Sequence, residues 1–270
     1  MMQAVPVISI VFMFITLIIS IGLPVALCVL FRKKLHGKLL PVLIGAVTFV
    51  LFALVLESGA HRLILSSAVG GAIQGSTVLL ALYGGIMAAL FEEGGRFIAM
   101  KLGMKKTLSR ENALMYGVGH GGIEAVVIVG LSYISNIAAS FMINSGILTA
   151  ALSALDAAAA EAAVQQVSAL WTTEPYLFLM SGVERLSAIA LHLGMSYLVY
   201  RAVKYGEKRF FFISFGVHFA VDAAAVLMSA AAPTIVLELV MLAAAAALIY
   251  AVCRLYRREP ELHPADAAEN

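Results

Sequence analysis

The chain has 270 residues, of which 62% are hydrophobic and 13% are charged, and its mean hydropathy is +0.97. This composition excludes an ordinary soluble domain and indicates a protein that crosses a membrane several times. The net charge of +2 gives no indication of nucleic acid binding. Neither Cys28 nor Cys253 has a second Cys or His at ligand spacing, so neither predicts a metal site.

Seven apolar runs are long enough to be transmembrane helices. In chain order they lie at about 6–31, 39–57, 73–95, 112–134, 176–200, 210–231 and 233–253. The first run lacks a preceding basic region and is long for a cleavable signal, so we interpret it as a retained span. We expect an all-α, polytopic transmembrane helix bundle that forms a single domain over residues 1–255. A cytoplasmic polar tail would follow over residues 256–270.

The basic residues predict the orientation of this bundle. Of the 18 Lys and Arg residues, 15 follow the first, third, fifth or seventh span. They are Arg32, Lys33, Lys34, Lys38, Lys101, Lys105, Lys106, Arg110, Arg201, Lys204, Lys208, Arg209, Arg254, Arg257 and Arg258. Because cytoplasmic loops are enriched in Lys and Arg, we expect the N-terminus outside and the C-terminus inside. The protein is then a multi-pass protein of a cell membrane, with the bacterial cytoplasmic membrane as the expected lipid bilayer.

Residues 137–175 do not fit a simple seven-span map. The stretch from Ile137 to Leu155 is apolar enough to span, but one extra crossing would put the basic residues 201–209 outside. We therefore expect an interfacial or re-entrant helix at about 137–170 on the outer side, or a hairpin of two crossings. Trp171 and Tyr176 would then lie at the membrane surface.

Four groups of ionisable residues lie within the third to sixth spans, one group in each. They are Glu92, Glu93 and Arg96; His120 and Glu124; Glu184, Arg185 and His192; and His218 and Asp222. An ionisable side chain inside a bilayer costs about 3 kcal/mol or more unless it is neutralised, paired or hydrated, so such residues indicate a functional site. For a single His or a Glu-Arg pair, a structural hydrogen bond between helices is the competing explanation.

The depth of these groups favours one shared site. Glu92, His120, His192 and His218 each lie nine or ten residues from the nearest basic residue of the inner side. At 1.5 Å per helical residue this places all four ~14 Å from the inner charged level. Four helices thus carry polar groups to one depth, and we expect a water cavity that opens to the inner side.

The spacing within two helices predicts imidazole–carboxylate pairs. His120 and Glu124 are four residues apart, as are His218 and Asp222, so the members of each pair share a helix face. In each pair the carboxylate can orient the imidazole of its own helix.

The spacing of the other ionisable residues predicts the directions in which their side chains point. Glu92 and Glu93 point about 100° apart, so only one of them can face the centre of the site. Because two adjacent carboxylates in a low dielectric do not both ionise easily, one can act as a general base while the other pairs with Arg96. Arg185 and His192, seven residues apart, also share a face.

Taken in order, these motifs resemble a known family. They are Glu-Glu-x-x-Arg at 92–96, Gly-x-Gly-x-x-x-x-Glu at 117–124, Glu-Arg with a His seven residues after the Arg, and His-x-x-x-Asp at 218–222. The combination resembles the YhfC family of membrane peptidases and, more distantly, PrsW proteases and the CAAX-prenyl-protease/ABI group of glutamic intramembrane proteases. The resemblance covers about residues 85–225 and implies an intramembrane protease.

The resemblance also implies roles for individual residues. Glu92 matches the catalytic Glu of the family and Glu93 its second Glu. His192 and His218 match the histidines of the second and third motifs, and Asp222 matches the Asn or Asp that follows the third-motif His.

Three departures from the wider group concern residues near the site. PrsW has Lys where this chain has Arg96, and the CAAX proteases place their Arg one residue later. Ala188 stands where Phe normally precedes the second-motif His. His120 has no clear counterpart, so the resemblance gives it no role.

The mechanism we expect is hydrolysis of peptide bonds in membrane-embedded or membrane-associated protein substrates. Glu92 and His192 would activate water, and His218, oriented by Asp222, would donate to the developing oxyanion. Supporting residues of the polar wall would be Arg96, His120, Glu124, Glu184 and Arg185. Neither the individual substrate nor the oligomeric state follows from the sequence.

Alternatives remain open at this stage. We prefer a site without a cofactor, but Glu92, His192 and His218 could instead hold zinc with an open water position. From a different class, the buried charges could form a proton- or cation-coupled transport path, although residues 1–134 and 135–270 show no repeat of each other. A membrane scaffold that retains an inactive site is a third interpretation.

Overall fold

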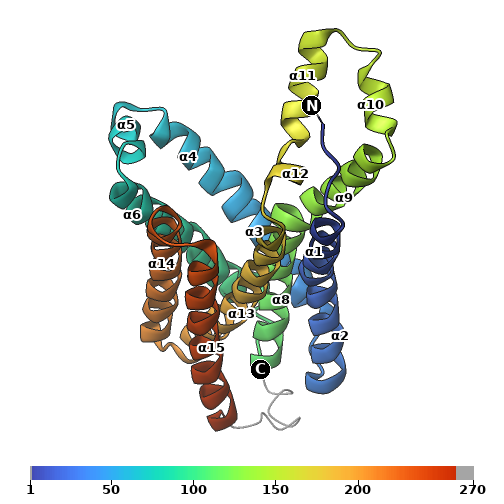
Figure 1. Ribbon diagram of the computed structural model, residues 1–270. Coiled ribbons are helices and arrows are strands. Elements are labelled where there is room, and N and C mark those ends of the chain that lie inside the picture. The colour runs from blue at the N-terminus through green and yellow to red at the C-terminus, as the bar shows by residue number, and fades with distance from the viewer. Residues whose placement is uncertain (1, 260–270) are drawn as a thin grey trace.

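The computed structural model describes residues 2–259, whose regular secondary structure is entirely helical (Figure 1). The α-helices are α1 (Val7–Leu17), α2 (Leu23–Leu35), α3 (Leu39–Phe49), α4 (Ser58–Leu65), α5 (Ala68–Gln74), α6 (Thr77–Ala88), α7 (Gly94–Ile98), α8 (Arg110–Ala125), α9 (Leu131–Asn144), α10 (Ile147–Leu152), α11 (Ala157–Val167), α12 (Ala169–Thr172), α13 (Pro175–Tyr205), α14 (Lys208–Ala231) and α15 (Thr234–Arg258). π-Helical segments lie at Ile18–Gly22, Val50–Glu57, Ala89–Glu93, Ala99–Gly103 and Val126–Gly130. The predicted all-α class is confirmed.

Seven helical stretches in the described residues are long and apolar enough to cross a membrane. They are Val7–Leu35, Leu39–Leu65, Thr77–Gly103, Arg110–Asn144, Pro175–Tyr205, Lys208–Ala231 and Thr234–Arg258. The chain is therefore a multi-pass membrane protein with the predicted number of spans. In Figure 1, α1 begins at the end of the bundle opposite to the end at which α15 finishes, as an odd number of crossings requires. Which end faces the cytoplasm stays a prediction.

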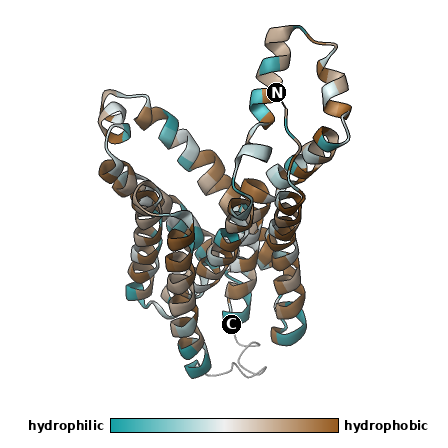
Figure 2. Ribbon diagram, in the orientation of Figure 1, coloured by the Kyte–Doolittle hydropathy of each residue, from teal (hydrophilic) through white to brown (hydrophobic). Residues whose placement is uncertain are grey.

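Polar residues mark the ends of the apolar bundle (Figure 2). The last turn of α2 carries Arg32, Lys33 and Lys34, and the last turn of α15 carries Arg257 and Arg258. Both turns lie at the lower end in Figure 2, where hydrophilic colour replaces the brown of the spans. This lower end corresponds to the predicted inner side.

Most of residues 137–175, which did not fit a simple seven-span map, form short helices outside the bundle. α9 continues the preceding span as far as Asn144, and α10, α11 and α12 are each too short to cross a bilayer. α10 and α11 bury none of their residues and project beyond the upper end of the bundle in Figure 1. In the described residues there is thus no two-crossing hairpin, and several short helices replace the one helix expected at about 137–170. Their place at the membrane surface stays a prediction.

α13 is the central helix of the bundle. In its most apolar window 72% of residues are buried, against 22% for α14 and for α15. It packs against α1, α8, α14 and α15. Its neighbour α8 also packs against α3. Because α13 touches helices from both halves of the chain, its side chains can meet polar groups from each.

Glycines let α8 approach its neighbours closely. A Cβ atom at Gly119 would lie 1.9 Å from the carbonyl oxygen of Val42, and one at Gly117 would lie 3.0 Å from that of His192. Neither distance leaves room for a side chain. The absence of these side chains allows His120 on α8 and His192 on α13 to reach one region.

The polar tail begins differently from the expectation. α15 continues to Arg258, within the segment assigned to the tail, and Glu259 is buried. The hydroxyls of Tyr197, Tyr200 and Tyr205 donate to the Glu259 carboxylate over 2.6, 2.5 and 2.7 Å. The rest of the predicted tail, residues 260–270, lies outside the described residues.

Candidate active site

Glu92 and Glu93 end the π-helical segment Ala89–Glu93 between α6 and α7. Single π-helical turns within α-helices are frequent at functional sites, because the wider turn displaces side chains from their ordinary directions. Both carboxyl groups are buried, but only Glu92 lines a cavity. The adjacent residues therefore meet different surroundings, as their angular separation predicts.

Glu92 lies between imidazoles from two helices. Its Oε2 accepts a hydrogen bond from Nε2 of His120 on α8 over 2.8 Å. Its Oε1 is 3.9 Å from Nε2 of His218 on α14. The hydroxyl of Tyr116 lies 3.4 Å from Nδ1 of His120 and so supports the far side of that ring.

Glu93 is a fully buried anchor. Its Oε1 accepts hydrogen bonds from Arg96 over 2.7 Å and from Nδ1 of His218 over 2.8 Å. Its Oε2 accepts a hydrogen bond from the Ser214 hydroxyl over 2.6 Å. The predicted Glu93–Arg96 pair is confirmed. The main partner of His218 differs from the expectation, since Glu93 holds its Nδ1 while Asp222 lies 3.5 Å from Nε2.

His192 is held from both sides. Its Nδ1 lies 2.8 Å from the Arg96 guanidinium, and its Nε2 lies 2.5 Å from Oε2 of Glu124. The other oxygen of Glu124 accepts a hydrogen bond from Arg185 over 2.7 Å. Arg185 and His192 therefore do share a face, and both bind one carboxylate of α8.

The pair predicted within α8 does not form. His120 turns to Glu92, whereas Glu124 turns to Arg185 and His192. Each residue thus exchanges its partner on the same helix for partners on neighbouring helices. The expectation of a His120–Glu124 pair was wrong because spacing within a helix does not specify what the adjacent helices present.

All the predicted site residues nevertheless belong to one connected network. Arg96 of α7 contacts His192 of α13, which contacts Glu124 of α8, and Arg185 adds its neighbour Glu184 to this network. The ring centroids of His120 and His192 are 4.9 Å apart, and those of His192 and His218 are 5.8 Å apart. Three imidazoles from three helices are therefore in contact around Glu92.

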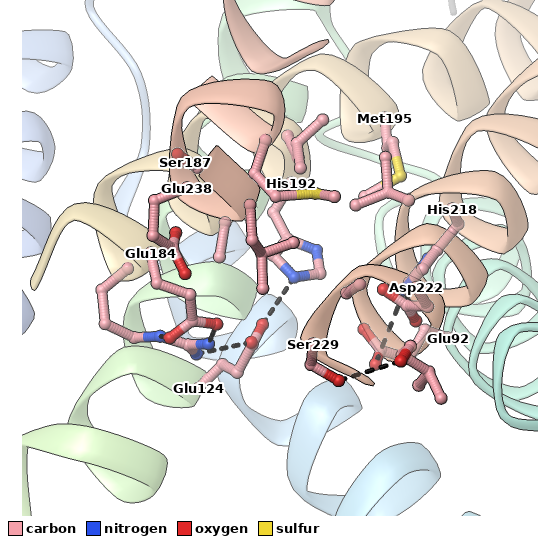
Figure 3. A pocket seen from close by; sticks show the side chains of 18 residues that line it. Glu92, Glu124, Glu184, Ser187, His192, Met195, His218, Asp222, Ser229 and Glu238 are labelled. Atoms are coloured by element: carbon pink, nitrogen blue, oxygen red, sulfur yellow. Dashed lines mark hydrogen bonds and ion pairs between the residues drawn. The ribbon is translucent and has the colours of Figure 1, made fainter. Parts of the chain in front are cut away.

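A cavity of about 480 Å³ adjoins this network, mainly between α13, α14 and α15. Figure 3 shows His192 and Glu124 on one side of it, and His218, Asp222 and Glu92 on the other. The ionisable residues that line it are Glu92, Glu124, Glu184, Arg185, His192, His218, Asp222 and Glu238. Glu93, Arg96 and His120 lie behind this wall.

The cavity extends toward the upper end of the bundle, which is the predicted outer side. Its lining residues occupy 184–195 of α13, 218–229 of α14 and 237–241 of α15. These are the parts nearest the turn between α14 and α15 and farthest from the basic last turn of α15. With the predicted orientation this is not the direction that we expected for the opening, and the orientation itself stays a prediction. The physical reason is that the inner half of α13 is filled by a core cluster that includes Tyr197, Tyr200 and Met100.

Sequence reasoning missed several polar residues near the site. Ser214 lies four residues before His218 on the same face, a spacing that could have revealed it. Glu238 is a single carboxylate in the last span and could have been found by the same rule as Glu92. Glu57 is buried and lies 3.2 Å from His61, whose other ring nitrogen contacts the Tyr83 hydroxyl.

One group of side chains fits a metal ion. Glu92, His120 and His192 each offer one ligand atom, and these atoms all lie within 4.8 Å of one another. All three residues are buried, and a carboxylate with two imidazoles is a donor set that suits zinc. His218 is not in this group. Its Nδ1 is bound to Glu93, and its Nε2 lies 3.9 Å from Glu92. The zinc site considered from the sequence contained Glu92, His192 and His218. In the structure His120 stands in the place of His218.

Comparison with known proteins decides the family. The chain matches the YhfC intramembrane metalloprotease family over residues 18–244. It belongs to this family. A relative from Bacillus subtilis (strain 168), the uncharacterized membrane protein YhfC, is 38% identical over 221 residues, which cover 81% of this chain and 84% of the relative. No solved structure gives a significant match.

Membership in the YhfC family bears on the expected chemistry. The description of the family supports a peptidase that acts within the membrane, as the motifs predict. It also implies a metal, which agrees with the donor group of Glu92, His120 and His192. It supports neither the preference for a site without a cofactor nor the glutamic type.

Proposed function

We propose that the chain hydrolyses peptide bonds of membrane-embedded or membrane-associated proteins with the help of a metal ion such as zinc. The observation that carries the proposal is the position of Glu92, His120 and His192, three buried donors within 4.8 Å of one another beside a cavity of about 480 Å³. Membership in the YhfC intramembrane metalloprotease family supports the same class of reaction.

Glu92, His120 and His192 would hold the ion. When bound, such an ion supplies a water that is nucleophilic at neutral pH and polarises the carbonyl group of the substrate. An ion would take the place of one present partner on each ring, because the nitrogens of His192 contact Arg96 and Glu124 and those of His120 contact Tyr116 and Glu92. The remaining partner would hold the ring. Such partners of a ligand ring set its orientation and tautomer.

Glu92 is the group that we assign to receive the proton of the attacking water. One of its oxygens is bound to His120, and the residue also lines the cavity where a substrate has access. A carboxylate in this position can accept a proton from water and later transfer it to the leaving amine.

His218 is assigned to stabilise the oxygen that becomes negative during attack. Glu93 holds its Nδ1 over 2.8 Å, so its Nε2 is the nitrogen directed toward Glu92 and Asp222. Because Nδ1–H is donated to Glu93, Nε2 carries a hydrogen only in the imidazolium form, which the neighbouring carboxylates of Glu92, Glu93 and Asp222 favour. In that form Nε2–H is a donor fixed in advance, and it stabilises developing charge without a cost of reorganisation at the moment of reaction. Glu93 and Arg96 act as positioning residues.

The proposal is tested with protein reconstituted in liposomes together with single-span protein substrates. Cleavage fragments are identified by mass spectrometry, and bound metal is measured on the same samples. We expect Glu92→Gln and His192→Ala to lose hydrolysis while the protein remains folded. Glu161→Gln, an equal change at an exposed position of α11, is the control. Full hydrolysis in protein without bound metal would overturn the metal-dependent form.

A further inference from the structure

Glu238 on α15 has a carboxylate oxygen without a partner. The residue is 5% exposed and lines the cavity, and its Oε2 is buried without a hydrogen bond in the described structure. Figure 3 shows Glu238 on the same side of the view as Glu184 and Glu124. It lies outside residues 85–225, which contain the motifs that define the site.

The other acidic residues of the cavity differ from Glu238 in their ion pairs. Each has a basic partner: Glu92 has His120, Glu124 has Arg185 and His192, Glu184 has Arg185, and Asp222 has His218. Oε2 of Glu124 also lacks a hydrogen bond, but it lies 2.5 Å from Nε2 of His192. Among the described residues no ion pair includes Glu238. Glu238 is therefore the carboxylate of the cavity that no side chain within residues 2–259 pairs with by contact.

Arg185, the Arg that lines the same cavity, is already bound to two other carboxylates. Its Nε donates to Glu184 over 2.8 Å, and its Nη1 donates to Glu124 over 2.7 Å. A buried carboxylate without a partner is costly, and inside a membrane it indicates a site for a ligand. A group that supplies positive charge would complete the site.

We propose that Glu238 binds a Lys or Arg side chain of the protein substrate and so determines specificity. This proposal rests on the proposed proteolytic function. Glu238 is the fifth residue of α15, which begins at Thr234. The basic residue of the substrate therefore lies on the side of the scissile bond that is toward the end of the bundle at which α14 and α15 meet.

Binding is measured first, with full-length Glu92→Gln protein in nanodiscs of phosphatidylethanolamine and phosphatidylglycerol. The probes are fluorescent single-span peptides in which one Lys is moved through the half nearest the α14–α15 turn, and matched peptides have norleucine instead. We expect Lys at one or two adjacent positions to lower Kd at least about 10-fold relative to norleucine, a factor that corresponds to about one lost charged contact.

Variants of Glu238 then test the assignment. Glu238→Gln should remove the preference for Lys, and Glu238→Lys should transfer the preference to peptides with Glu at the same position. Glu174→Gln, an exposed carboxylate before α13, is the matched control and should keep the preference. If Glu238→Gln does not fold, Glu238→Asp serves, and its preference for Lys should shift or weaken.

The outcomes separate this inference from the proposed function. Equal binding of Lys and norleucine peptides at every position would overturn the role of Glu238, as would a Lys preference that survives in Glu238→Gln. In cleavage assays with Glu92 restored, Glu238→Gln should raise KM for Lys substrates and leave kcat within about twofold, as expected for lost binding that does not change the chemical step. Lys-dependent binding without any cleavage would support Glu238 and overturn the proteolytic function alone.

Discussion

Glu93 lies 2.8 Å from Nδ1 of His218, while the preceding residue, Glu92, lies 3.9 Å from Nε2 of the same ring. Two consecutive carboxylates therefore bracket one imidazole. Glu93 is fully buried and also binds Arg96 and Ser214, whereas Glu92 lines the cavity. The pair thus divides into an anchor and a group with access to substrate.

This division predicts different results for two equal substitutions. Glu92→Gln should lower the rate of cleavage at least about 100-fold, because it removes the group that receives the proton. Glu93→Gln should lower the rate less but destabilise the protein more, since it leaves Arg96 buried without its carboxylate partner at a cost of about 3–5 kcal/mol. Initial rates and thermal unfolding in detergent measure both effects. Equal loss of rate in the two variants would show that the carboxylates act as one unit.

The position of His120 predicts which residues retain the metal. His120→Ala and His192→Ala should each reduce bound zinc far below one ion per chain, because each removes a donor of the group that lies within 4.8 Å. His218→Ala should keep the zinc and lose cleavage. Metal analysis of purified variants checks this, with exposed His36→Asn as the control. If His218→Ala lost zinc and His120→Ala retained it, the ligands would instead be Glu92, His192 and His218.

Removal of the metal gives a further test. Chelation by o-phenanthroline should abolish cleavage by the wild-type protein, and added Zn²⁺ should restore it in proportion to the bound metal. Thermal unfolding of the chelated protein distinguishes lost chemistry from lost fold. Cleavage that persists after all metal has been removed would favour activation of water by Glu92 and His192 alone.

A glycine of α8 predicts a link between packing and the site. A Cβ atom at Gly119 would lie 1.9 Å from the Val42 carbonyl oxygen, so Gly119→Ala must separate α3 from α8. We expect a loss of about 1–3 kcal/mol from overpacking and weaker zinc binding, because His120 is the next residue. Gly84→Ala and Gly216→Ala are the matched controls, since a Cβ atom at either glycine meets nothing within 4 Å. Stability in Gly119→Ala equal to that of the controls would contradict this account.

The sequence was sufficient to predict which residues lie in one region of the bundle. Distance along a helix is fixed at 1.5 Å per residue, so the number of residues from a basic helix end gives the depth of a side chain. This argument placed Glu92, His120, His192 and His218 at one level, and the structure brings them into contact. The number of spans followed from the length of apolar runs in the same way.

The partners within the site could not be predicted, for a physical reason. Spacing shows that His120 and Glu124 share a face of α8, but the rotation of α8 relative to α7 and α13 decides which residues that face meets. The direction of the cavity was also hidden, because it depends on how Tyr197 and Tyr200 fill the inner half of α13. Both features arise from packing between helices that are distant in the sequence.

The last prediction concerns the orientation of the bundle. A reporter fused after Arg258 should read cytoplasmic, and one inserted near Glu161 should read extracytoplasmic, because 15 of the 18 Lys and Arg residues follow odd-numbered spans. The structure supports the opposite placement of these two sites, since α11 projects beyond the end of the bundle opposite to the last turn of α15 (Figure 1). A cytoplasmic signal at both sites would contradict seven crossings. Extracytoplasmic Arg258 with cytoplasmic Glu161 would keep seven crossings but invert the bundle, and the cavity beside Glu238 would then extend toward the cytoplasm.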